Sequence, residues 1–269
     1  MDVFNPDALR GKVAFLAGAS SGINLGIAAG FARRGAAVFL ISRSAEKIEA
    51  AVAGLRAEGL KAHGMAADVR DFAAVEAAML AARERFGPID IVVSGAAGNF
   101  LAPAAAMSAN AFKTVVDIDL LGTFHVLRAS YPHLNKPGAA LMSITAPQGT
   151  NSMMLQAHVC AAKAGINMLT KCLAMEWGNE GIRVNAISPG PIADTEGMRR
   201  LAATPEAEQA LKGRLALRDY GTTTDIADTA LFLASDSARY ITGTIIDCDG
   251  GIKLGDASTM SAQEYALKA

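Results

Sequence analysis

Features that mark secreted, metal-binding or membrane-spanning proteins are scarce in this sequence. The three cysteines, Cys160, Cys172 and Cys248, are too few and too widely spaced for a disulfide framework or a zinc site. No apolar run approaches the roughly 18 residues of a membrane span, and the first residues lack the basic start and apolar core of a signal peptide. We therefore expect a cytoplasmic protein with reduced cysteines, no bound metal and no membrane partner.

An excess of charge of one sign is also missing. The 25 Lys and Arg residues nearly balance the 26 Asp and Glu residues. The basic residues are scattered along the sequence, so it predicts no basic surface for binding nucleic acid. With 51% hydrophobic and 19% charged residues, the 269-residue chain can form one large globular domain. A small molecule is the expected partner.

Short apolar runs alternate with longer helical patterns along the chain. This alternation predicts βαβ units, right-handed crossovers and an α/β fold with a doubly wound parallel sheet flanked by helices. Helices are expected at 21–34 and 45–58, each followed by a glycine. The expected strands are 13–17, 38–41, 89–94, 140–144, 184–187 and 244–247. Residues 189–220, with three prolines and three glycines, break the rhythm and are predicted to form a substrate lid.

A glycine-containing turn joins the first predicted strand to the first helix. Glycines let the backbone approach a pyrophosphate, and free N–H groups at a helix start attract the anion. The strand–turn–helix context predicts a dinucleotide site, with a simple βα turn as the alternative. The residues assigned to it are Gly18, Ser20, Ser21, Gly22 and Ile23.

Asn24 stands where this pattern usually has its third glycine, which normally permits close packing of helix on strand. Either the local backbone shifts, or Gly26 takes over that role.

Other strand ends extend the predicted cofactor site, because ligands of parallel sheets bind outside the carboxyl ends of the strands. Arg43 follows the second strand, where no acid is present for a ribose 2′-hydroxyl, and an arginine there can pair with a 2′-phosphate. This favours NADPH over NADH, with a merely exposed arginine as the alternative. The adenine and ribose are expected near Asp68, Val69, Ala96, Ala97 and Gly98, for which a helix N-cap and a turn are the alternatives.

Together with Lys163 and the Ser-Pro-Gly-Pro-Ile run at 188–192, these motifs resemble the short-chain dehydrogenase/reductase family over nearly the full chain. The resemblance implies one Rossmann-type domain over residues 1–269. Segments 95–101, 112–119, 158–163 and 190–197 are most similar to 2,4-dienoyl-CoA reductases of the peroxisomal type. The sequence does not end in a peroxisomal targeting tripeptide, so we expect a bacterial relative.

The same resemblance implies NADPH-dependent reduction of 2,4-dienoyl-CoA thioesters to enoyl-CoA in unsaturated fatty acid degradation, by a homotetramer that binds an acyl-CoA substrate. It also assigns cofactor contacts to the region after the sixth strand. Ile192 would hold the nicotinamide carboxamide through its backbone and Thr195 would contact a cofactor phosphate, with Pro189 and Gly190 beside them.

The family's usual catalytic pair is missing. A tyrosine at position 159 would share a helix face with Lys163, but that residue is valine, and Ala146 occupies the place of the family's serine. Asp119 lies on an apolar helical stripe, where a carboxylate is costly unless it is used or paired. We predict that Asp119 delivers a proton, directly or through water, and that Lys163 binds the nicotinamide ribose and supplies charge.

Simpler interpretations stay open at these positions. Asp119 would then make a structural hydrogen bond, Lys163 would extend its amine to solvent, and His158 would cap or pack its helix. Two rival functions also remain: a carbonyl reductase acting on 3-oxoacyl thioesters or another ketone, and a non-catalytic cofactor-binding interaction protein. Candidate substrate contacts are Ser143, Thr145 and Gln148 for a carbonyl, and Phe100, Leu101 and residues 197–201 for the acyl tail and CoA.

Overall fold

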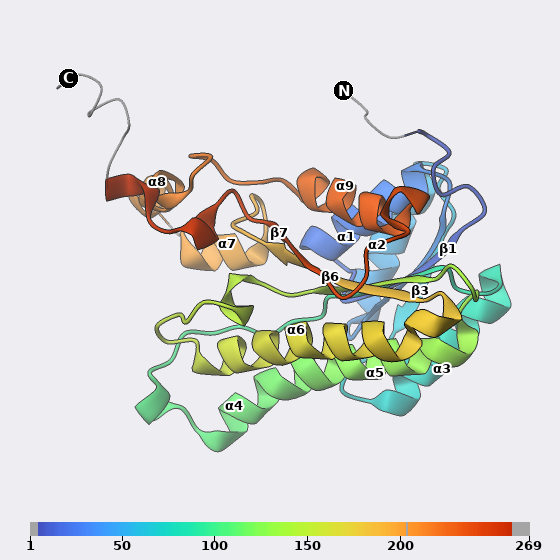
Figure 1. The fold of residues 1–269 in the computed structure, drawn as a ribbon, viewed down its shortest axis with the longest axis horizontal. Coiled ribbons are helices and arrows are strands. Elements are labelled where there is room, and N and C mark those ends of the chain that lie inside the picture. The colour runs from blue at the N-terminus through green and yellow to red at the C-terminus, as the bar shows by residue number, and fades with distance from the viewer. Residues whose placement is uncertain (1–4, 203, 260–269) are drawn as a thin grey trace.

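The computed structural model describes residues 5–202 and 204–259 and has an α/β architecture (Figure 1). A seven-stranded parallel sheet has the strand order β3-β2-β1-β4-β5-β6-β7. The strands are β1 (Val13–Ala17), β2 (Ala37–Ser42), β3 (Ala62–Ala66), β4 (Ile91–Ser94), β5 (Ala140–Ile144), β6 (Arg183–Pro189) and β7 (Ile245–Cys248). The direction of winding reverses between β1 and β4, and such a reversal opens a ligand crevice at the carboxyl ends of the strands.

Helices cover both faces of the sheet. They are α1 (Gly22–Arg33), α2 (Ala45–Ala57), α3 (Phe72–Phe86), α4 (Ala109–Val116), α5 (Gly122–Ser130), α6 (Ala157–Trp177), α7 (Glu196–Leu201), α8 (Pro205–Arg214) and α9 (Thr223–Ala234). The first two helices end within one residue of their predicted ends, and Gly35 and Gly59, which follow them, have positive φ angles. Glycine adopts this left-handed conformation without the steric cost that a side chain adds.

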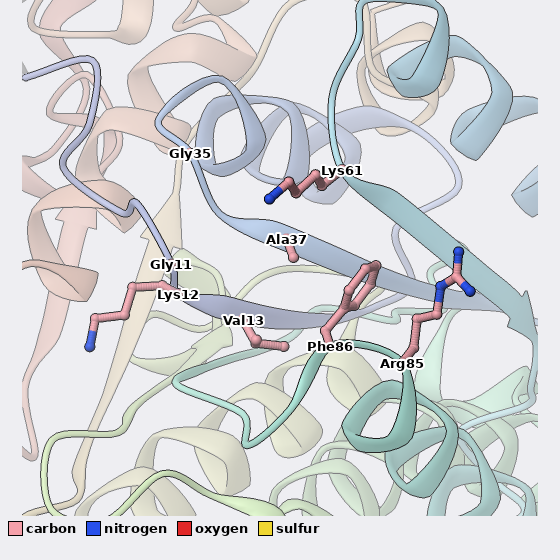
Figure 2. A pocket seen from close by; sticks show the side chains of 8 residues that line it. All are labelled: Gly11, Lys12, Val13, Gly35, Ala37, Lys61, Arg85 and Phe86. Carbon is pink, nitrogen blue, oxygen red and sulfur yellow. The ribbon is translucent and has the colours of Figure 1, made fainter.

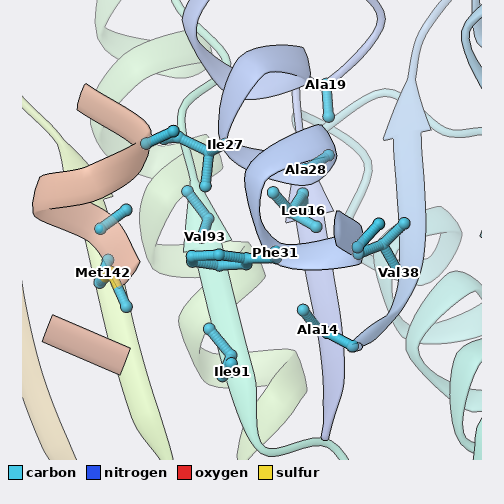
Figure 3. Close-up of a cluster of buried hydrophobic side chains, with 14 of the residues drawn as sticks. Ala14, Leu16, Ala19, Ile27, Ala28, Phe31, Val38, Ile91, Val93 and Met142 are labelled. Atoms are coloured by element: carbon cyan, nitrogen blue, oxygen red, sulfur yellow. The ribbon is translucent and has the colours of Figure 1, made fainter. Parts of the chain in front are cut away.

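Two hydrophobic layers separate along β1 because successive side chains of a strand point to opposite faces. Ala14 and Leu16 pack with α1, α2 and α9 on one face of the sheet. Phe15 packs with α3, α5 and α6 on the other face. Figure 3 shows Phe31 of α1 among the side chains of the first layer, with Leu16 and Val93 beside it.

The apolar runs of the sequence did not delimit β3. Its sequence, Ala-His-Gly-Met-Ala, is no apolar run, and three of its five residues are only half-buried. This strand lies at the edge of the sheet and pairs with β2 alone, so it needs fewer buried apolar side chains than a central strand.

Within residues 5–202 and 204–259, no helix is long and apolar enough to cross a membrane. The same residues contain no group of three or more His, Cys, Asp or Glu side chains arranged to hold a metal ion.

Candidate active site

A cavity of about 990 Å³ opens at the carboxyl ends of the strands, where the winding reverses. All but one of the predicted catalytic and cofactor-binding residues line it. The exception is Ser20, whose hydroxyl donates to the hydroxyl of Ser42 at 3.0 Å. The predicted residues in the wall are Gly18, Ser21, Gly22, Ile23, Arg43, Asp68, Val69, Ala96, Ala97, Gly98, Asp119, Lys163, Pro189, Gly190, Ile192 and Thr195.

The turn after β1 requires glycine at position 18. Gly18 has a φ of +73°, and a Cβ atom there would lie 2.7 Å from the backbone N and Cα of Ala96. The turn therefore packs directly against the loop that follows β4. Ser21, the N-cap of α1, makes no side-chain capping hydrogen bond, so a phosphate has room at the helix start.

Asn24 replaces the third glycine by bridging the two loops. Its Nδ2 donates to the carbonyl oxygens of Gly95 at 2.8 Å and Gly18 at 3.2 Å. Gly26 instead faces α9, where a Cβ atom would lie 2.7 Å from Thr223 Cβ. Gly26 therefore permits helix–helix packing, and Asn24 itself fills the space at the strand end.

Asp119 and Lys163 form a buried ion pair in the cavity wall. The side chain of Asp119 is 0% exposed and that of Lys163 is 7% exposed, with Asp119 Oδ2 3.1 Å from Lys163 Nζ. Asp119 Oδ1 accepts a hydrogen bond from the backbone N–H of Gly98 at 2.7 Å, and Lys163 Nζ donates to the Ile144 carbonyl at 3.1 Å. Both charged groups are thus held by the protein and face the same cavity.

A π-helical turn, Asp117–Leu121, presents Asp119 to the cavity. This turn interrupts the otherwise continuous helix that α4 and α5 would form, and π-helical turns often occur at functional sites. The neighbouring Asp117 pairs with Lys113 outside the cavity wall.

Three side-chain amides form a hydrogen-bonded chain beside this pair. Gln148 Nε2 donates to Gln156 Oε1 at 3.0 Å, and Gln156 Nε2 donates to Asn99 Oδ1 at 3.1 Å. All three residues line the cavity. The sequence placed Asn99 only in the segment after the fourth strand that was expected to face the cofactor, and it assigned no role to Gln156, although the position of Gln156 just before α6 was an available signal.

His158 packs in the protein interior and does not line the cavity, in agreement with the prediction that it packs its helix. Its ring is fully buried and lies 4.3 Å from the ring of Phe100, centroid to centroid. Burial lowers the pKa of His158, and the backbone of Phe100 and the charge of Asp119 partly oppose this effect. Phe100 thus contacts His158 and does not line the cavity, whereas Leu101 does.

The other candidate substrate contacts divide between core and cavity. Ser143 is fully buried in β5 and lies outside the cavity wall, so the prediction that it could contact a substrate is wrong. Thr145 and Gln148 line the cavity, as do Gly197 and Met198. The side chains of Arg200 and Leu201 lie outside the described residues.

Two arginines, Arg43 and Arg70, line the cavity near the ends of β2 and β3. Arg43 is exposed in the wall, at the end of β2. Asp68 accepts a hydrogen bond from Arg70 Nη2 at 2.6 Å, and hydrogen bonding to Arg70 holds the pKa of Asp68 below its usual range. Asp71, rather than Asp68, caps α3, so the N-cap alternative for Asp68 is wrong.

The chain after β6 folds against the β7 end of the sheet. A Cβ atom on Gly190 would lie 2.5 Å from the Asp249 carbonyl oxygen, so the close approach requires glycine. Thr195 Oγ1 donates to the Ile192 carbonyl at 2.8 Å and accepts from the backbone N–H of Met198 at 3.3 Å. Thr195 therefore caps α7 while it lines the cavity.

A second cavity, of about 230 Å³, lies at the amino ends of β1 and β2, on the side of the sheet opposite to the strand ends that line the large cavity (Figure 2). Lys12, Lys61 and Arg85 surround it, but their charged ends do not converge in Figure 2. None of the predicted site residues lines this cavity.

Comparison with known proteins agrees with the geometry of the large cavity. A family model described as enoyl-(acyl carrier protein) reductase matches residues 18–253. The chain is 45% identical over 252 residues to the peroxisomal 2,4-dienoyl-CoA reductase ((3E)-enoyl-CoA-producing) of Rattus norvegicus, which covers 93% of this chain and 86% of that protein. The protein of the same name from Pongo abelii is 44% identical, with the same coverage. The chain belongs to the short-chain dehydrogenase/reductase family.

A solved structure shows the same fold. A variant of actinorhodin polyketide ketoreductase with NADPH superimposes with a TM-score of 0.85 and 28% sequence identity, covering 90% of this chain and 97% of that one. Within the present short-chain dehydrogenase/reductase, Val159 and Ala146 both line the cavity. The positions of the usual tyrosine and serine therefore offer no side-chain proton donor.

Proposed function

We propose that this chain is an NADPH-dependent 2,4-dienoyl-CoA reductase that forms an enoyl-CoA. The observation that carries the proposal is the buried Asp119–Lys163 pair, which faces the cavity where Val159 and Ala146 replace the usual donors. A ketone substrate requires a proton at its carbonyl oxygen, which the missing pair would supply. A conjugated thioester accepts its proton at carbon, so a positioned acid beside the acyl chain suffices.

The cavity fits a dinucleotide. Gly18 lets the β1–α1 turn pack against the β4 loop, and Asn24 holds these two loops together. Ser21 makes no capping hydrogen bond, so the start of α1 can accept the pyrophosphate. Arg43 would pair with the 2′-phosphate, while Ile192 and Lys163 would hold the carboxamide and the nicotinamide ribose. When bound, NADPH supplies the hydride. The residues of this chain orient the acyl group and deliver the proton.

The overall reaction consumes a dienoyl-CoA, NADPH and one proton, and it yields an enoyl-CoA and NADP⁺. As the far end of the diene is reduced, electrons move toward the thioester and its oxygen gains negative charge. Lys163 adds positive charge nearby, and Asp119, directly or through water, delivers the proton to carbon. Proton delivery by a positioned acid accelerates such reactions by roughly 10² to 10⁴.

Apolar side chains near the cavity mouth suit an acyl tail. Leu101, Met153, Met154 and Leu155 are exposed large hydrophobic residues that line the cavity. Residues of α7 and α8 line it as well, among them Met198 and Leu211. This placement supports the proposal that 189–220 is a substrate lid within a single domain.

We further propose that the enzyme is a homotetramer in the cytoplasm. Leu121, Phe124, Met168 and Met175, which lie on the helices α5 and α6 or just before α5, are exposed hydrophobic residues, and such patches favour association with another subunit. Sedimentation velocity should therefore give a mass of four chains. A single-chain mass at micromolar concentration would contradict the tetramer and leave the enzymatic proposal intact.

Spectrophotometry of NADPH oxidation tests the activity directly. We expect 2,4-hexadienoyl-CoA to be reduced and a 3-oxoacyl-CoA to remain unchanged under the same conditions. Consumption of only the 3-oxoacyl thioester would replace the proposal by a carbonyl reductase. Consumption of neither would favour a non-catalytic cofactor-binding protein.

A further inference from the structure

Three consecutive apolar side chains are exposed at the large cavity, just before α6. They belong to Met153, Met154 and Leu155, and all three line the cavity. Single exposed apolar side chains are ordinary on a soluble protein, but contiguous ones beside a ligand cavity indicate a surface that a ligand covers. Residues 153–155 lead directly into the helix that carries Val159 and Lys163, so this surface adjoins the catalytic pair.

The backbone of Leu155 is held in a conformation that glycine adopts freely and other residues adopt only at a cost. Its φ is +65°, in the left-handed region. The Leu155 carbonyl accepts a hydrogen bond from the Ala102 N–H at 3.0 Å, which fixes the segment to the loop after β4. Backbone strain of this kind persists at ligand clamps, where the surrounding structure enforces it. The strain therefore fits a segment that holds an apolar ligand.

The saturated tail of the acyl chain is the part of the proposed substrate that matches this surface. Hydride adds to the far end of the diene, so the tail begins one carbon beyond the reacting atoms and must leave the catalytic pair along the cavity wall. The phosphates of CoA and NADPH are attracted instead to arginines. Arg43, Arg70 and Arg214 line the cavity at the end of β2, after β3 and on α8, away in sequence from residues 153–155.

We propose that residues 153–155 cover the acyl tail and make the enzyme selective for long-chain 2,4-dienoyl-CoA substrates. This inference rests on the dienoyl-CoA reductase function proposed above. Complete burial of one methylene group favours binding by about fourfold, and a methylene covered on one side gains about half of that free energy, or roughly twofold. Methionine side chains are flexible enough to follow tails of different length. A hexadienoyl group has only a methyl group beyond its diene and gains least.

A series of substrates of increasing length measures this selectivity. We expect KM to fall by roughly two- to fourfold per methylene from 2,4-hexadienoyl-CoA through 2,4-octadienoyl-CoA to 2,4-decadienoyl-CoA, at saturating NADPH. The turnover number should change much less, because contacts with the tail are the same in the ground state and the transition state. Isothermal titration of hexanoyl-CoA and decanoyl-CoA in the presence of NADP⁺ should give the same dependence of Kd on length without any reaction.

Met154→Ser tests the segment at its most exposed residue, which is 87% exposed. We expect KM for 2,4-decadienoyl-CoA to rise by at least about fourfold, the equivalent of one buried methylene, and KM for 2,4-hexadienoyl-CoA to change by less than about twofold. Leu254→Ser is the matched control, because Leu254 is an apolar residue of equal exposure, 86%, that lies outside the cavity wall. This control should retain the wild-type dependence on length.

Leu155→Gly provides a second test that does not depend on the first variant. Glycine keeps the left-handed backbone without strain, so the hydrogen bond from Ala102 can persist while the side chain is removed. We expect a weaker dependence of KM on chain length together with an unchanged Kd for NADPH. The unchanged cofactor affinity shows that the variant is folded.

The outcomes separate this inference from the function on which it rests. A wild-type enzyme that reduces all three dienoyl-CoA substrates with equal KM would overturn the selectivity alone, as would a length dependence that both variants retain in full. Length-dependent binding of the saturated acyl-CoAs without reduction of any dienoyl-CoA would overturn the function and support the contact with the tail. A protein that binds none of these thioesters would overturn both.

Discussion

At the scale of single residues, Asp119 carries the test of the proton-donor role. Asp119→Asn retains the size of the side chain and can still accept from Gly98 N–H, but it removes the ionisable group beside Lys163. We expect kcat to fall by roughly 10² to 10⁴, and NADPH affinity to change much less. Stopped-flow turnover and isothermal titration measure the two effects separately.

Asp117→Asn provides a matched control for that substitution. Asp117 lies on the same π-helical turn but pairs with Lys113 rather than with Lys163. Its replacement removes a partly exposed ion pair, which typically changes stability by less than about 1 kcal/mol, and turnover should remain near that of the wild type. Equal turnover in both variants and the wild type would exclude Asp119 as the acid.

Arg43 determines the cofactor preference if the end of β2 binds the 2′-phosphate. A charge-assisted hydrogen bond to that phosphate is absent with NADH and is worth roughly 1.5–3 kcal/mol. Arg43→Ala should therefore weaken NADPH binding by about tenfold or more and leave NADH binding nearly unchanged. Isothermal titration with both cofactors measures this, and equal affinities in the wild type would refute it.

At the scale of structural elements, the β1–α1 turn depends on the backbone freedom of Gly18. Gly18→Ala places a Cβ atom 2.7 Å from the Ala96 backbone at a φ of +73°. The left-handed conformation alone costs about 1–2 kcal/mol for an L-residue, and relief of the contact must move the turn or the β4 loop. We expect lower thermal stability and NADPH binding weakened by at least about tenfold.

Gly54→Ala in α2 is the corresponding control. No atom lies within 4 Å of a Cβ built there, and alanine favours a helix interior over glycine by about 1 kcal/mol. Calorimetry should show a higher Tm with unchanged NADPH affinity. A Gly18→Ala variant with wild-type affinity would show that the turn tolerates displacement or does not bind the pyrophosphate.

At the scale of the whole molecule, a buried histidine, His158, and a half-buried one, His133, make stability depend on pH. Burial lowers the pKa of both His158 and His133 below the value of roughly 6.5 expected in the unfolded chain. As the pH falls through that value, the unfolded chain takes up protons before the folded protein does. The free energy of unfolding should therefore decrease below about pH 6.5, by at most roughly 1.4 kcal/mol per pH unit for each histidine.

His158→Gln removes one of these groups and should reduce the slope. Urea denaturation of the cofactor-free protein between pH 7.5 and 5.5 measures the free energy of unfolding across this window. The variant should show a shallower decrease than the wild type, with the remaining dependence due partly to His133. An identical slope in both proteins would mean that His158 is protonated equally in the folded and unfolded states.

The sequence by itself determined the α/β fold, and all but one of the catalytic and cofactor-binding residues that it predicted line the large cavity. Parallel strands buried on both faces must be apolar along their length, so β1, β4 and β5 can be recognised as apolar runs in the sequence. A glycine directly follows β1 and β4. The strand ends converge at one edge of any such sheet. This rule brings Gly18, Asp68 and Gly98 together without knowledge of the packing.

Only the tertiary structure decided how individual side chains are used. It paired Asp119 with Lys163, withdrew Ser143 into the core, assigned Asn24 to bridge two loops, and aligned Asn99 with Gln156 across 57 positions of sequence. Local periodicity reports which face of an element is buried but carries no information about partners that are distant in sequence. Those partnerships depend on how α6, the β4 loop and the π-helical turn pack around one cavity, because a hydrogen bond requires its two atoms within about 3 Å.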